Sequence, residues 1–211
     1  MLRSLVRTTA FVVAAAAPVP FFPSIAEAFS LTTFRLQDAS IADINLAIDS
    51  GALSSEQLVQ LYLNRIAAYD QQGPTLNSLI TVNPNALQEA ILLDQQRGSV
   101  TDRSPLYGIP VIVKDNFNTF DLPTTAGALA FEGFVPANDA FQVQKLREAG
   151  AIILGKANLS EFAFSGSTSI SSLGGTTVNP YDPLRSPAGS SGGTGSAIAA
   201  SFAVLGLGTD T

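Results

Sequence analysis

The sequence predicts a layered α/β fold in which helices alternate with short apolar strands. Three segments, 108–113, 151–154 and 203–207, are short and rich in Val, Ile and Leu, as strands buried in a sheet are. Longer segments with helical spacing stand before and between them. Because helices that alternate with buried strands are typical of α/β layers, we predict this class for the folded part of the chain.

The folded part begins with two predicted helices, 41–49 and 54–69. In the second helix, apolar residues recur near helical spacing, and Ser54 followed by Gln57 resembles a capping box at its start. Gly51 separates the two segments, which together predict a short helix-turn-helix.

Two strands flank a helix in the middle of the chain. We predict a strand over 76–82 and a helix over 84–96, which an Arg-Gly pair ends. The apolar strand 108–113 comes after a polar loop, and Pro110 indicates the beginning of that strand or an edge position.

The last part of the chain continues the alternation. A helix over 138–149, closed by Gly150, leads directly into the apolar strand 151–154. A further helix is predicted to start at Asn158 or the next residue, and the strand 203–207 follows a helix-forming run of small residues. Asn158 also begins the one N-x-S/T sequon, which we predict to be unglycosylated because it caps that helix.

The composition excludes several classes of site. The chain of 211 residues has a net charge of −6 and an isoelectric point near 4.5, without a basic stripe, so nucleic acid is not an expected partner. It contains no cysteine, which excludes disulfides, thiol nucleophiles and cysteine metal sites. It contains no histidine, so neither a Ser-His-Asp triad nor a His/Cys zinc site can form within it. We predict no metal and no cofactor.

Residues 1–28 resemble a secretory signal peptide. Two arginines give a basic start, an apolar segment follows, and Ala-Glu-Ala at 26–28 matches a cleavage site. The alternative is an uncleaved anchor, because the uncharged segment 8–26 is nearly long enough to span a membrane. Three prolines interrupt that segment, so we predict cleavage, a secreted protein that starts at Phe29, and no stable membrane insertion.

A run of small residues at 186–196 joins a glycine-rich loop to a helix-forming segment. Such runs are most often flexible linkers, but the apolar segment 197–204 that follows is not typical of a linker. A phosphate-binding loop needs a lysine that is missing here, and a dinucleotide fingerprint needs a small residue where Ile198 stands. Composition alone favours a structural glycine loop, with a site built on Ser190 and Ser191 as the other alternative.

Four blocks, in order along the chain, resemble the amidase signature family. They are Gly-Ile-Pro-Val-Ile-Val-Lys-Asp-Asn-Phe at 108–117, Gly-Ala-Ile-Ile-Leu-Gly-Lys-Ala-Asn-Leu-Ser-Glu-Phe at 150–162, Gly-Ser-Ser-Gly-Gly at 189–193 and Gly-Thr-Asp-Thr at 208–211. The resemblance extends from about residue 34 to the last residue. It implies a layered α/β/α fold with a mixed central sheet, of which residues 29–211 form the N-terminal part, an incomplete amidase signature fold.

The resemblance implies roles for a lysine and a serine. Lys114 corresponds to the base of the family's Ser-Ser-Lys triad, and Ser190 to its middle serine, which follows a cis peptide bond. Ser191 is a neighbour with a weaker claim, and Thr211 belongs to the oxyanion side. Without the family, a lysine that ends an apolar strand is more often a surface cap than a buried amine. Burial would favour the neutral amine that a base requires.

The third member of the triad is expected beyond the given sequence. The family's nucleophile is the serine of Asp-x-Gly-Gly-Ser, which Asp210 and Thr211 begin, so it would follow Thr211 by three positions. We therefore expect a longer parent protein to hydrolyse the C–N bond of a small-molecule amide, and residues 1–211 alone to be inactive.

Two alternatives to this function stay open, as do the amide substrate and the oligomeric state. One is a glutaminase subunit of a tRNA-dependent amidotransferase, against which the predicted signal peptide argues because that work is intracellular. The other is a non-catalytic fragment.

The remaining motif residues are predicted to be mainly structural. We expect the loop after Lys114 to be fixed by Asp115, Asn116, Thr124, Thr125 and Gly127. Lys156 and Asp210 are predicted to be structural as well, whereas Ser165 and Ser167 are candidates for the acyl pocket. The apolar segment 197–208 is expected to leave an open strand edge.

Overall fold

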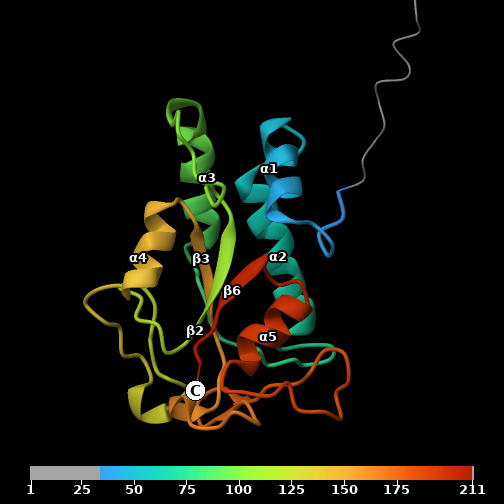
Figure 1. Cartoon of the computed structure of the whole chain (residues 1–211), viewed down its shortest axis with the longest axis vertical. Helices are drawn as coiled ribbons and strands as arrows, with labels where there is room; N and C mark the ends of the chain where they lie inside the picture. The colour runs from blue at the N-terminus through green and yellow to red at the C-terminus, as the bar shows by residue number, and fades with distance from the viewer. Residues whose placement is uncertain (1–33, 211) are drawn as a thin grey trace, which may run out of the picture. The chain divides into compact units, whose positions relative to one another are not determined.

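The computed structural model describes residues 34–210, which fold around a central sheet (Figure 1). The strands β1 (Leu79–Val82), β3 (Ile152–Ala157), β2 (Pro110–Lys114) and β6 (Leu205–Leu207) lie side by side in this order. β1 is antiparallel to β3, whereas β2 is parallel to both β3 and β6. The central sheet is therefore mixed, as predicted.

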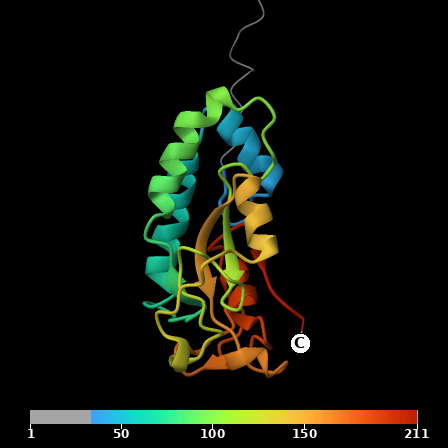
Figure 2. The same ribbon diagram turned by 90° about the vertical axis from the view of Figure 1, so that its left-hand side faces the viewer.

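Helices cover both faces of this sheet, which confirms the predicted α/β/α layers. They are α1 (Ile41–Asp49), α2 (Ser55–Tyr69), α3 (Ala86–Gln96), α4 (Phe141–Glu148) and α5 (Gly192–Ala199). Figure 2 shows α2 and α3 on one side of the sheet and α4 on the other. Because strand side chains alternate between faces, Ile112 and Leu154 pack with α1, α2, α3 and α5, whereas Val113 and Ile153 pack with Val143 of α4.

The first helices begin where their capping residues predict. Ser54 Oγ accepts a hydrogen bond from Gln57 N at 3.0 Å, and Gln57 Oε1 accepts one from Ser54 N at 3.0 Å. This reciprocal capping box starts α2, and Ser40 with Asp43 forms another at the start of α1.

The strands at the two edges of the sheet differ from the prediction. β1 begins only at Leu79, because the preceding residue, Ser78, donates hydrogen bonds to the Asp70 carboxylate instead. Its backbone N–H and its hydroxyl lie 2.7 and 2.6 Å from Asp70 Oδ1. β6 is half-buried rather than buried, because within the described residues it has only β2 beside it. An open edge at β6 agrees with the prediction for this segment.

The prediction of a helix that starts at Asn158 or the next residue is wrong. Only a single 3-10 turn, Glu161–Ala163, forms there, and Phe162 within it has a φ of 54°. Asn158 is fully buried and does not cap a helix: its amide nitrogen donates to the carbonyl oxygens of Asn77 and Gly175 at 3.3 and 3.1 Å. Further short elements are the 3-10 turns Arg97–Ser99 and Leu129–Phe131, and a small hairpin of β4 (Ile170–Ser171) and β5 (Gly175–Thr176).

The predicted signal peptide, 1–28, and Thr211 lie outside the described residues. Between residues 34 and 210, no helix is long and apolar enough to cross a membrane.

Candidate active site

Lys114 is the last residue of β2, the strand enclosed by β3 and β6. Its side chain has no exposed surface, so the structure excludes a surface cap of the strand. Burial lowers the pKa of Lys114 from 10.5 to about 8, because removal of water disfavours the ammonium form. The structure therefore places a readily deprotonated amine at the carboxyl end of a central strand.

Ser190 is brought to this amine by the turn that precedes α5. The peptide bond between Gly189 and Ser190 is cis, and the Ser190 side chain is almost completely buried. Ser190 O accepts a hydrogen bond from Ser160 N at 3.0 Å, which ties the turn to the segment after β3. At Gly193, a Cβ atom would lie 2.0 Å from Asn158 O, so only glycine permits this close approach of the two segments.

Four polar side chains from three segments meet at the end of β2, and we call them the Lys114 cluster. Lys114 Nζ lies 2.6 Å from Ser190 Oγ and 2.6 Å from Thr209 Oγ1. Asn116 Nδ2 donates to Thr209 Oγ1 at 3.1 Å. The predicted meeting of Lys114 and Ser190 is thus confirmed as geometry, at the edge where β2 and β6 both end.

Ser191 has a different place in the structure. Its Oγ donates to Thr209 O at 3.0 Å and accepts from Thr209 N at 3.1 Å. Both bonds join backbone to side chain, so Ser191 fastens the segment after β6 to the start of α5. This placement suits a neighbour that positions Thr209.

Lys156 and Asp115 fix the loop after β2 on the other face of the sheet. Lys156 Nζ lies 3.1 Å from Asp115 Oδ1, and both side chains are almost completely buried. Asp115 Oδ2 accepts from Thr125 N at 3.0 Å and also from the Thr125 hydroxyl. The interpretation of these residues as structural supports of the loop agrees with these contacts.

Two residues of this region have no role that the sequence indicates. Thr209 lies within the Gly-Thr-Asp-Thr block, so its motif is visible, but nothing in the sequence shows that its hydroxyl contacts Lys114. Ser169 is buried and donates to Ala188 O at 2.9 Å, while it accepts from Gly192 N at 2.9 Å. These two bonds stabilise the turn at 188–192, which we call the serine turn. No sequence signal distinguishes Ser169 from neighbouring serines.

Ser165 and Ser167 lie in the loop that packs against the same turn. Their hydroxyls are 3.2 Å apart, and Gly189 N donates to Gly166 O at 2.9 Å. The two serines therefore neighbour the turn, and their predicted place in an acyl pocket stays a prediction.

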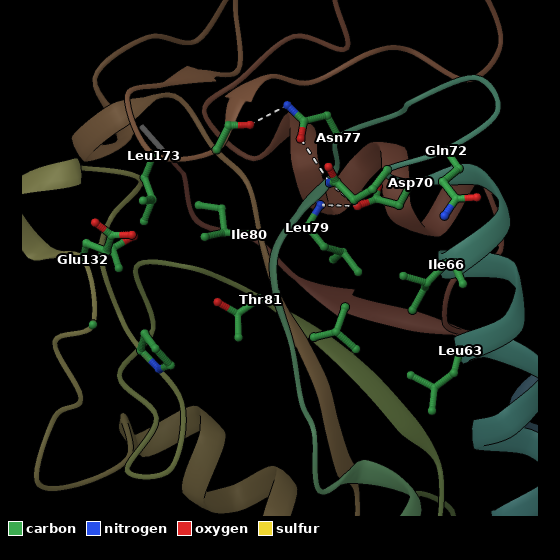
Figure 3. Close-up of a pocket in the computed structure, with 17 residues that line it drawn as sticks. Leu63, Ile66, Asp70, Gln72, Asn77, Leu79, Ile80, Thr81, Glu132 and Leu173 are labelled. Carbon is green, nitrogen blue, oxygen red and sulfur yellow. Dashed lines mark hydrogen bonds between the residues drawn. The ribbon is translucent and has the colours of Figure 1, made fainter.

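A cavity of about 740 Å³ lies beside β1 (Figure 3). Leu63 and Ile66 of α2 line one side of it, and Glu132 and Leu173 lie on the opposite side of the view. No member of the Lys114 cluster lines this cavity. Among residues 34–210, no group of acidic residues is arranged to hold a metal ion.

Comparisons with known proteins show the family of the chain. Residues 57–211 match the Amidase family model. A probable amidase of Arabidopsis thaliana is 43% identical over 187 residues, which cover 85% of this chain and 36% of that protein. A glutamyl-tRNA(Gln) amidotransferase subunit of Thermobifida fusca is 44% identical over 178 residues, which cover 84% of this chain and 35% of that protein.

A solved structure gives the same result for the fold. Native peptide amidase from Stenotrophomonas maltophilia matches with a TM-score of 0.74 and 48% identity, over 79% of this chain and 35% of that one. The chain belongs to the amidase family. It spans about a third of the length of these relatives, 35% to 36%.

Proposed function

We propose that the whole protein hydrolyses a carboxylic amide by a Ser-Ser-Lys mechanism in which Lys114 is the base and Ser190 the relay. One observation carries the proposal: the buried Lys114 amine lies 2.6 Å from the Ser190 hydroxyl. The Lys114 amine is in hydrogen-bond contact with this serine, and a deprotonated lysine can accept a proton from it.

In the proposed first step, two protons move together. The neutral Lys114 amine accepts the proton of Ser190 Oγ, and Ser190 Oγ accepts the proton of the nucleophilic serine. The nucleophile's oxygen forms a bond to the amide carbonyl carbon, and backbone N–H groups on the Thr211 side hold the oxyanion. The protons then return along the same path to the leaving amine, the C–N bond breaks, and water hydrolyses the acyl-enzyme.

The nucleophile would be supplied by the family's Asp-x-Gly-Gly-Ser motif, which Asp210 and Thr211 begin. A polypeptide limited to residues 1–211 contains Lys114 and Ser190 but no serine at that place. We therefore expect such a polypeptide not to turn over amides, whereas the protein that includes the motif does.

The experiment is amide hydrolysis by the protein with its nucleophile motif, measured on a panel of short and long amides. Lys114→Ala is expected to lower kcat/KM by about 10²–10⁴-fold, as loss of a general base does. Because the neutral amine is the active form, activity is expected to rise with pH through about 8. Lys145→Ala, a change at an exposed lysine of α4, is the control and leaves activity unchanged. Full activity of the Lys114→Ala variant would refute the proposal.

A second candidate is the glutaminase subunit of a tRNA-dependent amidotransferase, since the Thermobifida fusca relative is named as an amidotransferase subunit. Ammonia release from glutamine that depends on a partner and on charged tRNA would favour it over a stand-alone amidase.

We also propose that residues 1–28 are a cleaved signal peptide of a secreted protein. N-terminal sequencing of the mature protein is expected to begin at Phe29, and an intact N-terminus would contradict secretion by this route.

A further inference from the structure

Two lysines are buried side by side in the sheet, and the proposed mechanism uses only one of them. Lys114 ends β2, and Lys156 lies in the neighbouring strand β3; neither side chain has exposed surface. We propose that Lys156 is a positioning residue for the reaction: it is the charged partner of the Asp115 carboxylate and so keeps that carboxylate from stabilising the ammonium form of Lys114. This inference rests on the proposed function.

A bulge in β3 separates the two lysines. The register between β2 and β3 shifts at Val111–Ile112, where β3 holds one extra residue, Leu154. Because side chains alternate along a strand, Lys156 would share the face of Lys114 if this residue were absent. With the bulge, Lys156 lies opposite Val113 and faces the side that α4 covers.

Asp115 belongs to the Lys156 side for the same reason. It follows Lys114 directly, so its side chain points to the opposite face, where its Oδ1 lies 3.1 Å from Lys156 Nζ. Within residues 34–210, Lys156 is the polar partner that Oδ1 has, so this contact compensates its buried charge. The bulge therefore pairs the carboxylate with the second lysine rather than with the proposed base.

The atoms around the two amines call for different protonation states. Lys156 Nζ lies 2.9 Å from Pro123 O and 3.1 Å from the Asp115 carboxylate, and both of these oxygens can only accept hydrogen bonds. The hydroxyls of Thr124 and Thr119 lie 2.8 and 3.1 Å from the same nitrogen. Lys114 Nζ lies near the two hydroxyls of Ser190 and Thr209, which can donate as well as accept. The carboxylate and carbonyl of the first set require an ammonium group, whereas the hydroxyls of the second set accommodate a neutral amine as well as an ammonium group.

Charged groups also gather on the Lys156 side. Burial lowers the pKa of Lys156, and the carboxylates of Asp115, Asp121 and Asp139 oppose that shift. The last two are themselves paired with Arg147 of α4, at 2.6 and 3.1 Å.

On the Lys114 side, burial is the cause that lowers the pKa. The nearest acidic residue in the sequence is Asp115, and Asp210 follows Thr209 of the cluster. If Lys156 were lost, the Asp115 charge would stay buried one residue from Lys114 without its cation. It would then favour the ammonium form of Lys114.

Lysine NMR of the protein with its nucleophile motif can test this directly. Residues 1–211 contribute three lysines, Lys114, Lys145 and Lys156, and the Lys114 signal is assigned by its loss in Lys114→Met. The protein is labelled with lysine carrying ¹³C at Cε, and each signal is titrated with pH. Lys145→Met removes the signal of the exposed lysine and is expected to leave the Lys114 titration unchanged. The variants to compare are Lys156→Met, Asp115→Asn and the double variant.

In Lys156→Met, the pH midpoint of the Lys114 titration is expected to rise by about one unit or more, because a nearby uncompensated carboxylate favours the ammonium form. In the double variant, which removes both charges, it is expected to return close to the wild-type value. A purely structural role of Lys156 would not produce this reversal. A folded Lys156→Met variant in which the Lys114 signal has the same titration midpoint as in the wild type overturns the proposal. A double variant whose Lys114 midpoint stays shifted from the wild-type value also overturns it.

If Lys156→Met does not fold, the other two variants still decide. Asp115→Asn leaves the Lys156 cation without its carboxylate, so the pH midpoint of the Lys114 titration is expected to fall. The double variant is expected to reverse that shift. Identical Lys114 titrations in these two variants overturn the proposal. The measurement needs no turnover, so it fails separately from the proposed function, which the Lys114→Ala assay tests.

Discussion

A buried lysine lies on each face of the sheet around β2 and β3, and the two lysines have different polar partners. On one face, Lys114 meets the hydroxyls of Ser190 and Thr209, which can change hydrogen-bond direction. On the other, Lys156 is surrounded by a carboxylate and a carbonyl, which can only accept hydrogen bonds, and by two threonine hydroxyls. Neither side chain has exposed surface, so the partners rather than solvent exposure distinguish a candidate base from a structural cation.

The largest effect on stability is expected on the Lys156 side. Lys156→Ala leaves the Asp115 carboxylate buried without its cation, and removal of one partner of a buried ion pair costs about 3–5 kcal/mol. Thermal and denaturant unfolding measure the loss. The matched change Lys145→Ala breaks an exposed pair with Glu148 and is expected to leave the melting temperature unchanged. Equal melting temperatures for the two variants would show that the Lys156 pair is not important for the fold.

A second test concerns how the serine turn is held beside β3. In Gly193→Ala, the new Cβ would lie 2.0 Å from Asn158 O, so the turn must move away and Ser190 with it. The expected result is a protein destabilised by about 2 kcal/mol or more, in the range of backbone clashes. Gly195→Ala, in the same helix, meets nothing within 4 Å and is expected to stabilise by about 1 kcal/mol. Unfolding curves of the two variants that shift in the same direction would contradict this packing.

The smallest expected effect is at Thr209. Thr209→Val removes the hydroxyl that contacts Lys114 Nζ at 2.6 Å and Asn116 Nδ2 at 3.1 Å. Loss of one such hydrogen bond, about 1 kcal/mol, predicts about a fivefold lower kcat/KM in the protein with its nucleophile motif. Thr209→Ser keeps the hydroxyl and is expected to stay near the wild-type value. A Thr209→Ser variant as impaired as Thr209→Val would mean that the methyl group, not the hydroxyl, matters.

The predicted secretion and the expected inactivity of residues 1–211 depend on other parts of the protein. The first depends on residues 1–28, outside the described part of the chain, and the second on a serine beyond Thr211. Both stay predictions.

The sequence by itself determined the class of fold, the starts of α1 and α2, and the two residues that meet at the proposed site. These depend on local features: the capping pair of Ser54 and Gln57, short apolar strands, and motif blocks that keep Lys114 and Ser190 recognisable far apart in the chain. The tertiary structure alone decided the rest. Thr209 reaches Lys114 across 95 residues, and Asn158 binds the Asn77 carbonyl across 81, where the sequence predicts a local cap. The bulge at Leu154 turns Lys156 away from Lys114. Such features depend on how strands pair and turns approach one another, and neither propensity nor spacing within one segment specifies that pairing.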